Sequence, residues 1–263
     1  MKKGVIYTSI VGNYDPLLEH CYIMEDWDYI CFSESKAIVQ NHTIWKIIVL
    51  PSNEIKNNIR LSRLPKILPH RFLTEYEYSI YLDANINILD DTLEKRVNQL
   101  IKKNVKIAIA PHPQRDCVYE EAQVCIKSGK DKKSIIEKQI KEIYTLNNFP
   151  THFGLYQNNL IYRKHNDLVE LDQLWWDIYM KYSRRDQLSL VYALWRTGIL
   201  CENLFEQGFN IRESPKGFSF FRHEVPYTTK KTLYLRKGLR SKLKKWGILP
   251  FIHEVKKQFK LRK

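Results

Sequence analysis

YLDANI, at residues 81–86, sets two polar side chains directly after a strand-like run. Tyr81 and Leu82 end the stretch YSIYL, whose apolar and aromatic character is typical of a core strand. Asp83 and Asn85 follow with one residue between them, and on an extended segment such residues project to the same side. The stretch therefore predicts a buried strand that ends at a cleft with two oxygen-bearing side chains facing it.

Strand and helix patterns alternate on both sides of this stretch. Helical spacing over 57–73, interrupted by Pro65 and Pro69, predicts kinks or two short helices, and a second helix is expected at 92–104, capped by Asp90 or Asp91. This alternation predicts an open α/β sheet that is mainly parallel. The expected strands are 4–11, 28–33, 44–50, 78–86 and 105–111.

The second half of the chain is expected to be mainly helical, with helices at 133–147, 168–183 and 183–195. In open α/β sheets, ligands bind at the carboxyl ends of the strands. Unusual polar residues stand at those ends in this sequence. They occupy 8–15 after the first strand, Asp83 and Asn85 after the fourth, and 112–116 after the fifth.

Composition predicts a globular protein of one large domain, with or without an appendage. The chain has 263 residues, of which 44% are hydrophobic. Its five cysteines include no C-x-x-C pair, a pattern that favours reduced thiols in the cytoplasm over a disulfide framework or a zinc site. The N-terminal apolar stretch is broken too early for a signal peptide, and no membrane span is expected.

Positive charge is concentrated at the C-terminal end. Residues 230–263 hold thirteen Lys/Arg and one acid, and so account for +12 of the net charge of +14. We therefore expect a near-neutral domain at 1–229 and a basic segment at 230–263. Leu235, Leu239 and Leu243 recur within that segment at amphipathic helical spacing. It is interpreted as an anchor on anionic lipid or as a helix packed on the domain, and the charge density favours the anchor.

Asp83 and Asn85 are candidate ligands for magnesium or manganese, which accept carboxylate and carboxamide oxygens. The alternative is a turn, where both residue types are common. Residues 55–74 contain no acid, so a helix face with Arg60, Arg63 and Lys66 could bind a diphosphate or could simply be solvated. His223 is interpreted either as a third metal ligand or as a structural histidine.

Two further polar stretches are candidates for substrate binding. PHPQRDCVYEEA, at 111–122, contains His112, Arg115 and Asp116 in a proline-fixed loop. SRRDQ, at 183–187, stands at an expected helix start, where Ser183 and Asp186 have capping-box spacing. Four hydrogen-bonding side chains in a row are more than capping requires.

These motifs together resemble a known family, the glycosyltransferase-like domain first catalogued as domain of unknown function 616. Its members occur among plant cell-wall proteins and in bacterial surface-polysaccharide clusters. The resemblance covers about residues 4–225 and implies a GT-A-like fold that binds a nucleotide sugar. The matching stretches are VGNYDPL, DWDYICFS, NNIRLSRLPKILPHRFL, YSIYLDANI, HPQRDCVYEEA, FPTHFGLYQNNLIYRKHN, WW and SRRDQLS.

The resemblance also implies roles for individual residues. Asp83 and Asn85 would occupy the metal-binding D-x-D-type motif, although an asparagine here replaces the second acid. Asp186 and Gln187 would lie near the donor sugar or the acceptor hydroxyl and carry catalysis. Thr8, Ser9 and Tyr14 would contact the nucleoside, and Arg60, Arg63 and Lys66 the diphosphate and sugar. His112, Arg115, Asp116 and Arg185 would contact the sugars.

The sequence thus predicts a cytoplasmic, metal-dependent glycosyltransferase of bacterial surface-polysaccharide synthesis. Its donor is expected to be a UDP-sugar and its acceptor a glycan or lipid-linked hydroxyl at the inner membrane face. An inactive sugar-nucleotide-binding or scaffold protein is the first alternative, which Asn85 keeps open. A nucleic-acid-binding protein is disfavoured because the domain has no basic groove. A haloacid dehalogenase-type phosphatase is disfavoured because its nucleophile would end the first strand, which here ends in GNYD.

Overall fold

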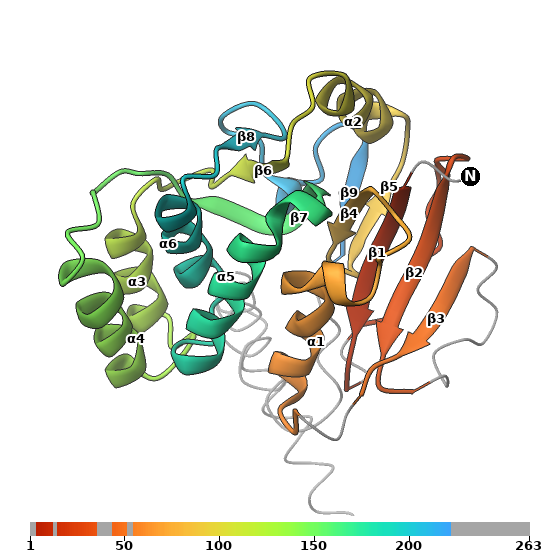
Figure 1. Cartoon of the computed structure of the whole chain (residues 1–263). Coiled ribbons are helices and arrows are strands. Elements are labelled where there is room, and N and C mark those ends of the chain that lie inside the picture. The colour runs from red at the N-terminus through yellow and green to blue at the C-terminus, as the bar shows by residue number, and fades with distance from the viewer. Residues whose placement is uncertain (1–3, 13–14, 36–43, 52–54, 222–263) are drawn as a thin grey trace, which may run out of the picture. The chain divides into compact units, whose positions relative to one another are not determined.

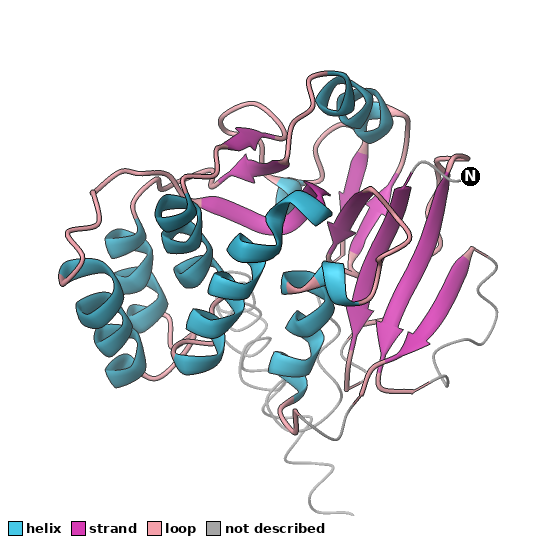
Figure 2. Cartoon of the chain, in the orientation of Figure 1, coloured by secondary structure: helices cyan, strands magenta, loops and turns pink. Residues whose placement is uncertain are grey.

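A seven-stranded mixed sheet forms the centre of the protein (Figures 1 and 2). The computed structural model describes residues 4–12, 15–35, 44–51 and 55–221. The strands lie in the order β3-β2-β1-β4-β7-β6-β8, and all neighbours are parallel except that β7 is antiparallel to β4 and β6. Their bounds are β1 Gly4–Ile10, β2 Trp27–Ser33, β3 Trp45–Val49, β4 Tyr78–Leu82, β6 Ile107–Pro111, β7 Tyr156–Lys164 and β8 Cys201–Asn203.

Helices cover both faces of this sheet, as an α/β fold requires. On one face α1, α5 and α6 bury leucines and Trp175 against β1 and β2, and on the other α2 packs with the small β5–β9 sheet. A third cluster joins α3, α4 and α6. The bounds are α1 Asn58–Ile67, α2 Thr92–Lys102, α3 Val118–Lys127, α4 Lys133–Gln139, α5 Val169–Lys181, α6 Gln187–Thr197, β5 Ile86–Ile88 and β9 Phe218–Phe220. Shorter helical turns are η2 Pro69–Arg71, η3 Ile140–Thr145, η4 His165–Leu168 and η5 Ile211–Glu213.

The predicted α/β class, a mainly parallel mixed sheet flanked by helices, is confirmed. The five predicted strands are all present, with ends shifted by a few residues. The predicted division of 57–73 is also confirmed, because α1 continues through Pro65 and ends at Ile67, and η2 begins at Pro69. Tyr14, His223 and the segment 230–263 lie outside the described residues.

Two features of the sheet differ from the prediction. Strand β7 lies in the half that was expected to be mainly helical, and it was not predicted. The stretch 83–86 is a turn rather than the end of an extended strand, closed by a hydrogen bond of 3.0 Å from the Ile86 amide to the Asp83 carbonyl. The alternation of side chains along a strand therefore does not apply at residues 83 and 85, and it gives no reason for the two side chains to point the same way.

Gly4 provides a test of the sheet. A Cβ at this position would lie 2.7 Å from the Tyr78 carbonyl oxygen of β4 and 2.6 Å from the Trp27 ring. We expect Gly4→Ala to lower the free energy of unfolding by roughly 1–3 kcal/mol, because a backbone atom cannot move aside without disturbing strand pairing. Urea unfolding measures the change. Lys46→Ala on the exposed side of β3 is the control, and an equal loss in both variants would contradict the prediction.

Candidate functional site

The carboxyl ends of β1 and β4 and the start of β7 meet at one edge of the sheet. Antiparallel pairing of β7 places its first residues beside the ends of β4 and β6, with Leu82 opposite Leu160 and Pro111 opposite Tyr156. Within the described residues, buried polar atoms at this edge have no hydrogen-bond partner: the hydroxyls of Thr8 and Ser9 and both side-chain atoms of Asn158. Such atoms are available to a ligand.

Lys66 and Asp186 form the central contact at this edge. The Lys66 ammonium lies 2.6 Å from a carboxylate oxygen of Asp186, and the Lys66 side chain is only 2% exposed. Arg63 Nε lies 3.4 Å from the same oxygen, and the Arg63 side chain remains 29% exposed. Lys66 and Arg63 are one turn apart on α1, and Asp186 precedes α6, so the contact joins two helices that are distant in sequence.

Asp83 is linked to the same group of side chains through Tyr81. The Tyr81 hydroxyl donates a hydrogen bond of 2.8 Å to Asp83 Oδ1. The Lys66 ammonium lies over the Tyr81 ring, 4.8 Å from its centroid. We call Arg63, Lys66, Tyr81, Asp83 and Asp186 the edge cluster; it holds two cations and two carboxylates.

Electrostatics keeps Asp186 ionised. Burial alone would raise the pKa of Asp186, but the positive charges of Lys66 and Arg63 outweigh it and lower that pKa to about 2. Burial lowers the pKa of Lys66, and the nearby carboxylates of Asp186 and Asp83 oppose that shift. Burial and the Asp83 carboxylate raise the pKa of Tyr81, so its hydroxyl keeps its proton and remains a donor.

Capping does not explain Asp186. Helix α6 begins at Gln187, and the Asp186 side chain makes no capping hydrogen bond. The Ser183 hydroxyl instead donates to Asp131 over 2.9 Å and accepts from the Arg185 amide. The capping-box alternative is therefore wrong, and the carboxylate of Asp186 is committed to the two cations of α1.

Arg60 does not lie in the edge cluster, although it has the helical spacing of Arg63 and Lys66. Its guanidinium donates to the main-chain carbonyls of Tyr179 and Tyr182, at the C-terminal end of α5. Cations at the C-terminal end of a helix can donate hydrogen bonds to its last carbonyls, and they interact favourably with the helix dipole. The predicted diphosphate-binding face is thus reduced to Arg63 and Lys66.

Asp83 and Asn85 differ as possible metal ligands. Asp83 is half-buried, and Tyr81 hydrogen-bonds one of its carboxylate oxygens. Asn85 is only 2% exposed, and its amide nitrogen donates over 2.8 Å to the Phe221 carbonyl next to β9. Asp83 fits a magnesium or manganese ion that keeps waters and phosphate oxygens as its other ligands. Asn85 is used here to join the β5–β9 sheet to the turn.

A second group of side chains follows β6 and precedes α6. Arg115 donates over 2.7 Å to Glu121, which is almost fully buried on α3. The ring of His112 accepts from the Arg115 amide, and its pKa is lowered by burial and by Arg115, Arg212 and Arg185. This loop cluster, His112, Arg115, Glu121 and Arg185, collects three of the predicted sugar-contacting residues at one place.

Gln187 connects the loop cluster to β7. Its amide nitrogen donates over 2.8 Å to the Tyr156 carbonyl, and its amide oxygen accepts from Arg185. Arg185 also helps to lower the pKa of Asp186, so the two clusters are electrostatically connected. Gln187 thus holds Arg185 in place.

Asp116 has another partner. Its carboxylate lies 2.7 Å from Nδ1 of His152, a residue of the loop before β7. Glu121 stands in the polar stretch 111–122 that the sequence singled out, whereas Tyr81, Asn158 and His152 were not proposed as site residues. All three stand in stretches that carry the family resemblance, but nothing in the sequence alone shows that the loop before β7 returns to this edge.

The fold and the edge cluster together define an α/β protein whose candidate ligand site lies at the carboxyl edge of its sheet. The family model described as TOD1/MUCI70, glycosyltransferase-like domain, matches residues 20–210. The chain therefore belongs to this family, which confirms the family predicted from the sequence and its glycosyltransferase class. All residues of the edge and loop clusters lie within the matched residues, whereas Thr8 and Ser9, which belong to neither cluster, precede them.

One curated relative and two solved structures are similar to this chain. The probable hexosyltransferase MUCI70 of Arabidopsis thaliana is 25% identical over 154 residues, which are 56% of this chain and 26% of that protein. The chain thus spans about a quarter of the relative's length. The apo structure of the bifunctional glycosyltransferase WbbM aligns with 77% of this chain and 38% of its own, with a TM-score of 0.44 and 11% identity. Mouse xyloside xylosyltransferase 1, also without ligand, aligns with 76% and 83%, with a TM-score of 0.43 and 11% identity.

Within residues 4–12, 15–35, 44–51 and 55–221, no helix combines the length and the apolar character needed to cross a bilayer.

A double-mutant cycle tests the ion pair at the centre of the edge cluster. Removing one partner leaves the other charge buried, so we expect Lys66→Met and Asp186→Asn each to lower the free energy of unfolding by roughly 3–5 kcal/mol. The double variant should lose clearly less than the two losses combined. Urea unfolding at neutral pH measures all four proteins.

Two controls accompany this cycle. The exposed pair Lys95–Asp91, at 2.8 Å, should show little coupling because solvent screens it. The low pKa of Asp186 adds stability above pH 4 that disappears as pH falls toward 2, so the Lys66–Asp186 coupling should weaken over that interval. Additive losses at neutral pH, or coupling of undiminished size at pH 2, would contradict the ion pair.

Proposed function

We propose that the chain is a metal-dependent glycosyltransferase that binds a nucleoside diphosphate sugar, with UDP as the nucleotide, at the edge cluster. The observation that supports this most is the position of Asp83 near Arg63 and Lys66, close enough for its charge to act on both cations, at the carboxyl end of β4. A carboxylate that can hold a divalent ion, beside two cations on one helix, matches the charges of a metal–diphosphate complex. The family to which the chain belongs supports the same class of reaction.

The bound metal would stabilise the negative charge that develops on the diphosphate as the sugar leaves. Among the described residues, Asp83 would hold this ion, and phosphate oxygens and water would complete its coordination. Arg63 is the partly exposed cation of the cluster and would reach the diphosphate directly. Lys66 is buried beside Asp186 and the Tyr81 ring, and from there its ammonium would also stabilise the charge of the diphosphate.

The geometry of Asp186 suits positioning better than proton abstraction. A carboxylate with a pKa near 2, held by two cations, is a weak base at neutral pH. Its role in this proposal is to fix Lys66 and Arg63 in place, while the Ser9 hydroxyl, on the face of β1 that packs against α1, and the amide of Asn158 would receive the donor. The loop cluster, whose two arginines and nearby Arg212 surround His112, would hold the acceptor or the donor sugar.

Calorimetric titration with UDP tests the donor site. We expect binding that strengthens with manganese and is weakened at least tenfold in Asp83→Ala, because the variant removes the carboxylate that holds the ion. Asp91→Ala is the matched control, since Asp91 is an acid of the same chain that pairs with Lys95 away from the cluster. Equal UDP binding in wild type and Asp83→Ala would contradict the site.

Turnover separates an active enzyme from an inactive sugar-nucleotide-binding protein. A panel of UDP-sugars, scored by release of UDP with and without glycan acceptors, should show metal-dependent turnover that Asp83→Ala abolishes. Binding of UDP without release from any donor would favour the scaffold alternative. Binding of nucleic acid that survives Asp83→Ala would favour the remaining alternative, a nucleic-acid-binding protein.

We also propose that residues 230–263 hold the enzyme on the inner face of a bacterial membrane, where lipid-linked acceptors of surface polysaccharide reside. The support is sequence alone: thirteen Lys/Arg with leucines at amphipathic spacing. In this proposal the protein is cytoplasmic and peripheral to the membrane.

Vesicle flotation tests the proposed anchor. The full chain should float with anionic vesicles at low salt, and binding should fall at high salt, because Lys/Arg near such a surface contribute about 1 kcal/mol each. Neutral vesicles are the control for lipid charge, and a chain ending at residue 229 is the control for the segment. Equal flotation of the shortened and full chains would contradict the anchor.

A further inference from the structure

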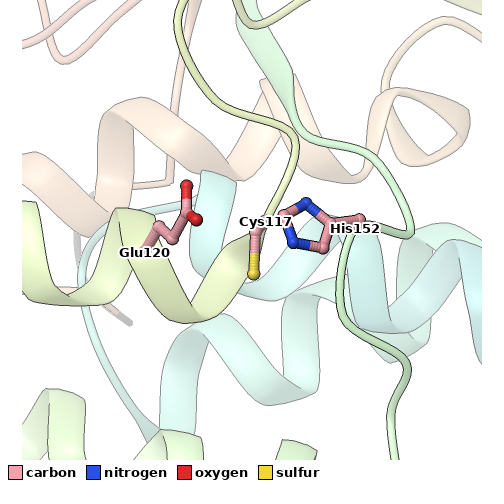
Figure 3. Close-up of side chains that lie close together, drawn as sticks. All are labelled: Cys117, Glu120 and His152. Carbon is pink, nitrogen blue, oxygen red and sulfur yellow. The ribbon is translucent and has the colours of Figure 1, made fainter.

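Three side chains outside both clusters lie close enough to share a metal ion (Figure 3). One ligand atom each from Cys117, Glu120 and His152 lies within 4.8 Å of the other two. Cys117 directly precedes α3, Glu120 lies in its first turn, and His152 comes from the loop before β7. In Figure 3 a ring nitrogen of His152 faces the sulfur of Cys117.

The second observation is the contact between His152 and Asp116. Nδ1 of His152 lies 2.7 Å from a carboxylate oxygen of Asp116, which leaves Nε2 as the nitrogen available to a metal. Histidine ligands in metal proteins commonly bind through one ring nitrogen while the other donates to a carboxylate, which fixes the ring orientation. The buried Cys117 thiol next to His152 distinguishes the His152–Asp116 contact from an ordinary surface ion pair.

The backbone holds the two loops together before any metal binds. The Gly154 amide donates to the Asp116 carbonyl over 3.0 Å, and the His112 amide donates to the Leu155 carbonyl over 2.7 Å. His152 itself has a φ of 56°, in the left-handed region that costs energy for a residue other than glycine. The ligand positions are therefore set by the fold rather than by chance contact of long side chains.

We propose that Cys117, Glu120 and His152 form a zinc-type metal site, with Asp116 as the positioning residue of His152. Thiolate, imidazole and carboxylate together favour zinc over magnesium or manganese, which prefer oxygen ligands only. On binding, the Cys117 thiol releases its proton to solvent, and the two negative charges of Cys117 and Glu120 balance a divalent ion.

The geometry requires only a small adjustment. Tetrahedral zinc sets its ligand atoms about 3.5 Å apart, so the three atoms must approach one another by about 1 Å. Cys117 is 3% exposed, whereas Glu120 is exposed and can rotate toward it while Asp116 keeps the His152 ring in place. Three protein ligands leave a fourth position for water. The site would tie α3 to the loop before β7, next to the loop cluster.

Cobalt substitution of the full chain tests this proposal without depending on sugar transfer. Cobalt bound to a thiolate gives a charge-transfer absorption in the near ultraviolet, which cobalt on oxygen ligands lacks. We expect this band in the wild type, its displacement by zinc, and its loss in Cys117→Ser and in His152→Asn. Asparagine tolerates the left-handed backbone, so the second variant removes the ligand without adding strain.

Three further variants serve as controls. Cys21→Ser removes an exposed cysteine elsewhere and should keep the band. Asp83→Ala should also keep it, which separates this site from the metal proposed for the donor. Asp116→Asn should weaken cobalt binding by about 10–100-fold while the band remains at saturation, as expected of a positioning residue. Absence of the band in the wild type, or its persistence in both Cys117→Ser and His152→Asn, would overturn the proposal.

Discussion

The buried contact between Lys66 and Asp186 determines how the candidate site is assembled. Moving both charges out of water is costly, and only their 2.6 Å approach and the nearby Arg63 offset that cost. Because Lys66 belongs to α1 and Asp186 precedes α6, the pair fixes these helices relative to each other above the end of β4. The Trp175 ring nitrogen donates to the Asp186 carbonyl, so α5 is held at the same point. Stability and the geometry of the site thus depend on one interaction.

The antiparallel strand β7 provides the other constraint. A sheet that was parallel throughout would begin this strand at the opposite edge, far from Asp83 and the loop after β6. Reversal brings Asn158 and the loop before β7 to the carboxyl ends of β4 and β6, where the Asp83 amide donates to the Asn159 carbonyl over 2.9 Å. Candidate ligands for the donor, the acceptor and the proposed zinc ion therefore come to one edge from segments that are distant in sequence.

Local patterns predicted β1, β2, β3, β4 and β6 because each is a short run rich in apolar and aromatic residues, whereas the short strand β8 was not predicted. They failed at β7, whose run YQNNLIYRK mixes polar and apolar residues and lies between helices. They also assigned Arg60 to the diphosphate by spacing alone. Helical periodicity gives the face on which a side chain begins, but the C-terminal carbonyls of α5 are a tertiary partner that no periodicity reveals. The pairing of Asp186 with Lys66 and Arg63 could not be predicted for the same reason, because it joins residues that are distant in sequence.

The two carboxylates of the edge cluster differ in burial and in their partners. Asp186 is 7% exposed and lies against two cations, so its charge is neutralised within the protein and little of it remains for a ligand. Asp83 is half-buried and receives one hydrogen bond from Tyr81, which orients it without cancelling its charge. A divalent ion is attracted to negative charge that it can reach, and Asp83 is the more exposed of the two carboxylates. The sequence motif proposes both Asp83 and Asn85 as ligands, whereas the packing leaves the Asp83 carboxylate partly exposed and engages the Asn85 amide with the Phe221 carbonyl.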